Sequence, residues 1–102
     1  MAYTLLVEFE WDESKNKSNQ LKHGVSFEEA SQLFSGDVET LEIFDELHSE
    51  REDRFISIGP IKHGLVLVVW TERDADIIRI ISARWATSRE SQHYHAYLKD
   101  LS

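Results

Sequence analysis

The sequence predicts an α+β fold, an antiparallel sheet of about four to five strands with helices packed on it, in the order β-α-α-β-β-β-β-α. Three observations predict this fold. A short alternating apolar run opens the chain, two capped helices follow it, and the second half consists of Ile-, Val- and Leu-rich runs separated by polar turns. The 102 residues suffice for one domain, which we expect to span residues 1–102.

The first strand is predicted over residues 5–11, where Leu5, Val7, Phe9 and Trp11 alternate with other residues at a period of two. Asp12 then suits the N-cap of a helix, and Gly24 suits its left-handed end. The helix between them contains one large apolar residue, Leu21, so we expect it to face mostly solvent.

A second, short helix follows, because Ser26 and Glu29 have the spacing of a capping box. Its apolar residues fall on one face, and Gly36 is expected to end it. A brief strand is predicted over residues 39–44, and an acidic loop over the residues that follow it.

The second half of the chain predicts a meander of three strands, over residues 54–60, 65–71 and 77–84. The run LVLVVW is apolar at every position, so residues 65–71 are expected to form the central strand. A second capping box, at residues 87–90, begins a last helix with one apolar stripe. That stripe comprises Tyr94, Tyr97, Leu98 and Leu101.

Composition excludes several classes of protein. With 11 Lys+Arg against 19 Asp+Glu the net charge is −8, so the chain as a whole is not a basic nucleic-acid-binding module. The absence of cysteine excludes disulfide scaffolds, cysteine zinc sites and thiol catalysis. No apolar run approaches the roughly 20 residues that span a bilayer, and the N-terminus lacks a signal-peptide pattern. We therefore expect a cytoplasmic protein with no membrane partner.

The charge is unevenly distributed along the chain. Residues 36–53 contain eight acids and one base, whereas residues 77–99 contain four bases and one acid. The local field decides whether a phosphate can bind, so the C-terminal region can still accept one. No metal site is expected, because His93 and His95 point about 200° apart on a helix. No cofactor motif is present, such as a glycine-rich phosphate loop.

Three arginines lie in or at the end of predicted strands: Arg54, Arg79 and Arg84. Arginine within an apolar strand must reach solvent, a carboxylate or a ligand phosphate. Ion pairs with nearby acids and a shared phosphate site therefore both remain open. Because Arg79 and Arg84 are five residues apart, they share a face only if the strand ends or bulges near residues 82–83.

Further candidates each have a structural alternative. His23, at a helix C-terminus beside Lys22, suits proton transfer or simple capping. Glu90 suits proton transfer or the capping box, and Tyr94 suits ligand contact or the core. Trp85 follows Arg84 where the sheet ends and could stack on a base, although core packing is the usual role of tryptophan.

These residue types fit metal-free RNA cleavage, which needs a base for the ribose 2′-hydroxyl, cations for the phosphorane charge and an acid for the leaving oxygen. His23 or a glutamate (Glu50, Glu72) could transfer protons, and the arginines with Lys22 could supply the cations. On composition alone this fit is permissive, since many soluble domains contain the same residue types.

Three motifs, in the order in which they occur, point to a specific protein family. They are FEWDESKNKSNQLKHGVSFEEA (residues 9–30), HSEREDRFISIG (residues 48–59) and RIISARWATSRE (residues 79–90), followed by Tyr94. Together they resemble the BrnT family of type II toxins. The resemblance implies a RelE-like fold, a ribonuclease that arrests translation, and a neutralising BrnA-like antitoxin of the ribbon-helix-helix class. It also implies that operator DNA is bound only through the toxin–antitoxin complex.

The resemblance and the residue chemistry together give two sets of expected site residues. The expected catalytic residues are His23, Arg54, Arg79, Arg84 and Glu90. The expected RNA-binding residues are Lys22, Arg79, Arg84, Trp85 and Tyr94.

The chain departs from the family pattern after Glu90, where Ser91 and Gln92 stand in place of frequent basic residues. Fewer cations weaken phosphate binding. An alternative is therefore a weak or inactive member that acts mainly as antitoxin-binding partner and co-repressor of its operon.

Overall fold

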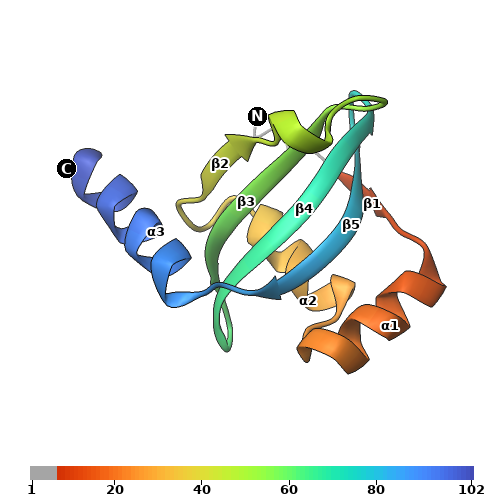
Figure 1. Ribbon diagram of the computed structural model, residues 1–102, viewed down its shortest axis with the longest axis horizontal. Coiled ribbons are helices and arrows are strands. Elements are labelled where there is room, and N and C mark those ends of the chain that lie inside the picture. Colours follow the sequence, from red (N-terminus) through yellow and green to blue (C-terminus); the bar gives the residue numbers. More distant parts are fainter. Residues whose placement is uncertain (1–6) are drawn as a thin grey trace, which may run out of the picture.

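The computed structural model describes residues 7–102, which form a five-stranded sheet in the order β1-β5-β4-β3-β2, with helices α1, α2 and α3 (Figure 1). The strands are β1 Glu8–Glu10, β2 Leu41–Phe44, β3 Arg54–Ile61, β4 Gly64–Asp74 and β5 Ile77–Trp85. The α-helices are α1 Glu13–His23, α2 Phe27–Ser31 and α3 Ser88–Asp100, and short 3-10 turns cover Gln32–Phe34 and Glu46–His48. The expected strand at residues 5–11 is thus shorter, and its first two residues lie outside the described part of the chain.

The α+β prediction is confirmed, and β4 is the central strand as expected. The prediction of an antiparallel sheet holds for β2 to β5 and is wrong for β1, which pairs parallel to β5 in the register Glu8 with Ile77. The physical reason is the path of the chain: two helices and three strands intervene before β5 returns to the edge beside β1, in the same direction. Alternation within one strand carries no information about its distant partner.

The predicted starts of the helices and the predicted end of α1 are confirmed by their caps. The prediction that Gly36 ends the second helix is wrong, because α2 ends at Ser31 and the 3-10 turn Gln32–Phe34 follows it before the chain reaches Gly36. Asp12 accepts a hydrogen bond from the Lys15 backbone N–H at 3.1 Å, and Gly24 ends α1 with φ +74°. Both capping boxes form, at the starts of α2 and α3. These interactions are local, so the sequence could specify them without knowledge of the tertiary fold.

Helix α1 is mostly exposed, as expected, but its buried face is polar. Leu21, its one large apolar residue, is 91% exposed, whereas Asn16 and Asn19 are buried. The Asn19 amide donates to the carbonyls of Ala83 at 2.7 Å and Val25 at 3.0 Å, and its oxygen accepts from the Ala83 N–H. Strand β1 pairs with residues 77–79 of β5, so it does not reach Ala83. Asn19 satisfies the backbone N–H and carbonyl of Ala83 instead, and these hydrogen bonds attach α1 to the sheet.

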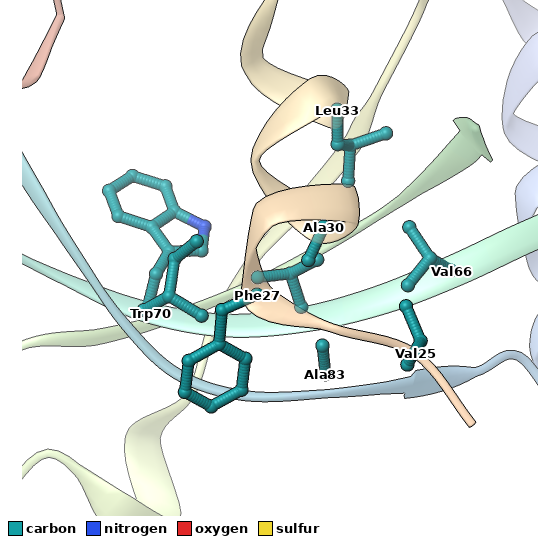
Figure 2. Packing of buried hydrophobic residues seen from close by; sticks show 9 residues of the cluster. Val25, Phe27, Ala30, Leu33, Val66, Trp70 and Ala83 are labelled. Carbon is teal, nitrogen blue, oxygen red and sulfur yellow. The ribbon is translucent and has the colours of Figure 1, made fainter. Parts of the chain in front are cut away.

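The main core lies between α2 and one face of the sheet, which we call the helix-covered face. Figure 2 shows Phe27 and Ala30 of α2, with Leu33 after it, packed over the strands that carry Val66, Trp70 and Ala83. An apolar helix stripe and the inward residues of alternating strands supply this core.

Close packing against Gly59 of β3 leaves no room for a side chain at this position. A Cβ at this position would lie 2.6 Å from Leu33 Cδ1 and 3.3 Å from the Glu39 carbonyl oxygen. Glycine therefore allows the 3-10 turn after α2 to approach the sheet closely.

Helix α3 packs at one end of the other face, which we call the open face and which carries Arg54, Val69 and Ser82. Tyr94, only 4% exposed, packs with Ile58 and Leu67, and Leu98 contacts this cluster. Leu101 is exposed, so the predicted stripe is wrong at its last position. The cause is visible in Figure 1, where α3 runs outward beyond the sheet.

Across residues 7–102, none of the helices is long and apolar enough to cross a membrane.

Candidate functional site

A bulge in β5 determines where two of the predicted site residues lie. Val69 pairs with Ser82 while the next residue, Trp70, pairs with Ile80, so Ile81 is an extra residue in β5. Arg79 pairs with Thr71 and Arg84 with Leu67, four residues apart on β4. Partners across a ladder point to the same face, so the bulge brings both arginines to the open face.

The third arginine joins them from the other side of β4. Arg54 is the partner of Thr71 on β3, so Arg54 and Arg79 flank the same threonine. Thr71 is buried, and its hydroxyl donates to the Asp53 carbonyl at 2.6 Å. The three strand arginines therefore belong to one face of the sheet, as a shared phosphate site requires.

A groove of about 310 Å³ runs over this face between β3 and the start of α3. Its lining comprises Asp45, His48, Arg54, Ile56, Leu67, Val69, Ile81, Ser82, Arg84 and Glu90. A second hollow of about 550 Å³ adjoins it at His48 and Arg54 and is lined in addition by Leu47, Glu50, Arg51 and Glu52. The groove thus contains three of the predicted catalytic residues, Arg54, Arg84 and Glu90.

Arg54 is the cation in the groove with the fewest contacts. Its side chain is 35% exposed, and its ion-pair contact is Glu52, at 3.6 Å from Nε to Oε1. That Nε is buried and has no hydrogen-bond partner within residues 7–102. A buried N–H donor without a partner is costly in free energy, and Glu52 Oε1 at 3.6 Å lies just beyond hydrogen-bond distance of it. The exposed part of the guanidinium is the part that an acceptor such as a phosphate oxygen can reach.

Arg84, by contrast, is held by Glu90. The two guanidinium nitrogens donate to the two carboxylate oxygens at 2.7 and 2.8 Å, and Glu90 Oε1 also accepts from the Thr87 N–H. The hydrogen bonds from Arg84 lower the Glu90 pKa to about 2, with help from the Thr87 N–H and despite partial burial. The same pair raises the pKa of Arg84. Glu90 is therefore ionised at neutral pH, a state that suits holding Arg84 better than donating a proton.

Arg79 lies on the same face but outside the groove lining. Its Nη1 lies 3.3 Å from Glu10 Oε1 on β1, and Arg73 contacts the same oxygen at 3.2 Å. The ion-pair alternative considered for the arginines thus accounts for Arg79, with Glu10 as the acid rather than those near in sequence.

The other candidates lie elsewhere. Tyr94 is in the core beneath α3, where burial raises its pKa and its hydroxyl donates to the Glu39 carbonyl at 2.8 Å. Trp85 packs against the helix-covered face. Lys22 and His23 end α1 beside Gly24, where a Cβ would lie 3.9 Å from the Trp85 indole nitrogen. The structure therefore groups Lys22, His23 and Trp85 apart from the groove.

Sequence reasoning missed two groove residues, Asp45 and His48. His48 Nδ1 lies 2.9 and 3.1 Å from the two carboxylate oxygens of Asp45. The signal was present, since His48 opens the motif HSEREDRFISIG, but an acidic loop gave no reason to expect it beside Arg54. Within residues 7–102, no cluster of three or more His, Asp or Glu side chains is arranged to hold a metal ion.

Comparisons with known proteins agree with this architecture. The chain matches the crystal structure of the Brucella abortus ribonuclease toxin BrnT with a TM-score of 0.61 and 22% identity, over 80% of this chain and 99% of that one. At that identity the likeness shows a shared fold. No curated protein shows significant sequence similarity. A family model described as the ribonuclease toxin BrnT of type II toxin–antitoxin systems matches residues 11–90. Because that match spans most of the chain, the chain belongs to the BrnT family of type II ribonuclease toxins.

Proposed function

We propose that residues 1–102 act as one cytoplasmic toxin domain, a metal-independent endoribonuclease that inhibits translation by cutting RNA in the groove of the open face. The observation that carries the proposal is Arg54, a partly exposed cation that lines the groove and whose ion-pair contact, Glu52, lies 3.6 Å away, outside hydrogen-bond distance. The exposed part of its guanidinium can donate to an RNA phosphate, for which a planar guanidinium is well suited.

Cleavage of the RNA would depend on stabilising the negative charge that develops on the phosphate. Attack of the ribose 2′-oxygen on the neighbouring phosphate places extra negative charge on the phosphate oxygens. Fixed cations such as Arg54 and Arg84 stabilise that charge. The products are a 2′,3′-cyclic phosphate and a 5′-hydroxyl. Glu90 then acts through Arg84, whose guanidinium it orients toward the groove.

A type II toxin requires an antitoxin, and we propose a BrnA-like protein of the ribbon-helix-helix class. Charge complementarity favours a partner segment that covers the cationic arginines of the open face. Operator DNA would be bound through that complex, because the toxin itself has a net charge of −8.

One observation favours the alternative of a weak toxin that acts mainly as antitoxin partner and co-repressor. Acids surround the groove: Asp45 and Glu90 line it, and Glu50 and Glu52 line the adjoining hollow. Such acids oppose the approach of a polyanion and reduce its affinity.

Controlled expression of the chain without antitoxin separates the two functions. The nuclease predicts growth arrest by the wild type, loss of arrest in Arg54→Ala, and arrest by the matched control Arg89→Ala, whose side chain is exposed on α3. Purified protein should then cut RNA in EDTA and leave 2′,3′-cyclic phosphate ends. Normal growth with folded wild-type protein, together with tight antitoxin binding, would instead support the co-repressor.

A further inference from the structure

We propose that His48, oriented by Asp45, is the proton-transfer group of this site, an inference that rests on the proposed ribonuclease function. A site of this kind needs a base for the ribose hydroxyl as well as cations. The groove supplies the cations Arg54 and Arg84, and His48 is the histidine that lines it.

The contact between His48 and Asp45 selects one tautomer of the neutral imidazole. Nδ1 lies within hydrogen-bond distance of both carboxylate oxygens, at 2.9 and 3.1 Å. An ionised carboxylate can only accept, so in the neutral imidazole the proton lies on Nδ1 and the lone pair on Nε2. The Asp45 side chain is 14% exposed and the His48 side chain 65% exposed, so the carboxylate is sheltered while the ring remains accessible to a substrate.

The backbone holds this pair close to the start of β3. The Asp45 N–H donates to the Arg54 carbonyl at 2.8 Å, and the Arg54 N–H donates to the Ser49 hydroxyl at 3.0 Å. Ser49 in turn donates to the Asp45 carbonyl. These hydrogen bonds hold the turn Glu46–His48 against the start of β3. The His48 imidazole and the Arg54 guanidinium therefore come from two segments that are fixed relative to each other.

The surroundings of His48 define its electrostatic field. His48 and Arg54 line both hollows. The charged groups that face them are Asp45 beside the turn, Glu50, Arg51 and Glu52 of the following loop, Arg54 of β3, Arg84 of β5 and Glu90 of α3. A phosphate bound to Arg54 would therefore have a base at the same groove, next to the ion pair of Arg84 and Glu90.

The step balances without any further reagent except water. Nε2 of His48 takes the proton of the 2′-hydroxyl as the 2′-oxygen forms its bond to phosphorus. The bond from phosphorus to the 5′-oxygen breaks, and water protonates that leaving oxygen. The resulting hydroxide takes the proton from Nε2, which returns the imidazole to its starting state.

Single-turnover cleavage of a fluorescent RNA, measured from pH 5 to pH 9, tests this role. We expect His48→Gln to lower the rate constant by about 100-fold or more with RNA affinity unchanged, and to remove the rise in rate that follows imidazole deprotonation. Asp45→Asn should lower the rate by a smaller factor and change the pH profile, because its amide can no longer hold the tautomer. His63→Gln, in the exposed β3–β4 turn, is the matched control and should resemble the wild type.

A His48→Ala variant guards against a simple folding defect, since added imidazole should restore part of its cleavage. Two outcomes would overturn the role of His48 while leaving the ribonuclease function intact. One is a wild-type pH profile in His48→Gln, and the other is loss of the rise in rate with pH in His23→Gln instead. If folded wild-type protein cuts no RNA, the ribonuclease function fails and the role of His48 fails with it.

Discussion

Arg84 at the end of β5 and Glu90 in the first turn of α3 form a two-point salt bridge, with nitrogen–oxygen distances of 2.7 and 2.8 Å. Glu90 simultaneously completes the capping box with Thr87. One carboxylate therefore both begins a helix and orients a cation at the groove, which links the position of α3 to the geometry of the site.

We predict that this salt bridge makes stability depend on pH. The Glu90 pKa falls from 4.5 to about 2, so its contribution is fully present above pH 4.5 and is lost as the pH falls toward 2. Glu90→Gln should therefore lower the free energy of unfolding by about 1–2 kcal/mol at pH 7, after solvent screening, and by much less near pH 2. Urea unfolding across this range measures it, with exposed Glu72→Gln as control. A difference that is constant with pH would contradict the prediction.

We predict that Asn19 contributes more to stability than the large apolar residue of its helix. Asn19→Ala leaves the N–H and carbonyl of Ala83 without their partner, and should cost about 2–4 kcal/mol. Leu21→Ala should change stability by less than about 0.5 kcal/mol, because the side chain is 91% exposed. Denaturant unfolding of both variants compares them, and equal losses would show that α1 is not attached through Asn19.

We predict that Gly59→Ala overpacks the core. The new Cβ would lie 2.6 Å from Leu33 Cδ1, and relieving this clash should cost about 1–3 kcal/mol. The cost should shrink in a Leu33→Ala background, because the clashing methyl group is then absent. Thermal unfolding of the two single variants and the double variant measures the coupling, and strict additivity would exclude this contact as the cause.

We predict that Arg54 makes one phosphate contact in the RNA complex. With uncleavable 2′-O-methyl RNA, Arg54→Ala should weaken binding and reduce the magnitude of the slope of log affinity against log salt by roughly 0.7. The exposed Arg89→Ala variant should leave both quantities near the wild-type values. An unchanged slope in Arg54→Ala would place the phosphate elsewhere.

The sequence predicted most of the fold because its signals were local. Caps at Asp12, Gly24, Ser26 and Thr87, and the apolar run of β4, depend on neighbouring residues alone. The parallel pairing of β1 and the outward course of α3 depend on distant contacts, and there the expectations for an antiparallel edge and for Leu101 were wrong.

The candidate site was predictable in its residue types and less so in its assembly. Arg54, Arg84 and Glu90 come together at the groove, whereas His23, Lys22 and Trp85 lie by the helix-covered face. Burial explains why Tyr94 has little surface to offer a ligand. Whether each residue acts in catalysis or RNA binding stays a prediction for the variants above.

The family and the order of elements follow from local signals, because motifs and caps consist of residues that are close together in the chain. Which side chains come into contact depends on the folded arrangement of the strands. The extra residue Ile81 in β5 brings Arg84 to the face that carries Arg79, and the turn at Asp45 brings His48 beside Arg54. The physical reason is that the face of a side chain depends on strand register, which is set by pairing between residues far apart in the chain.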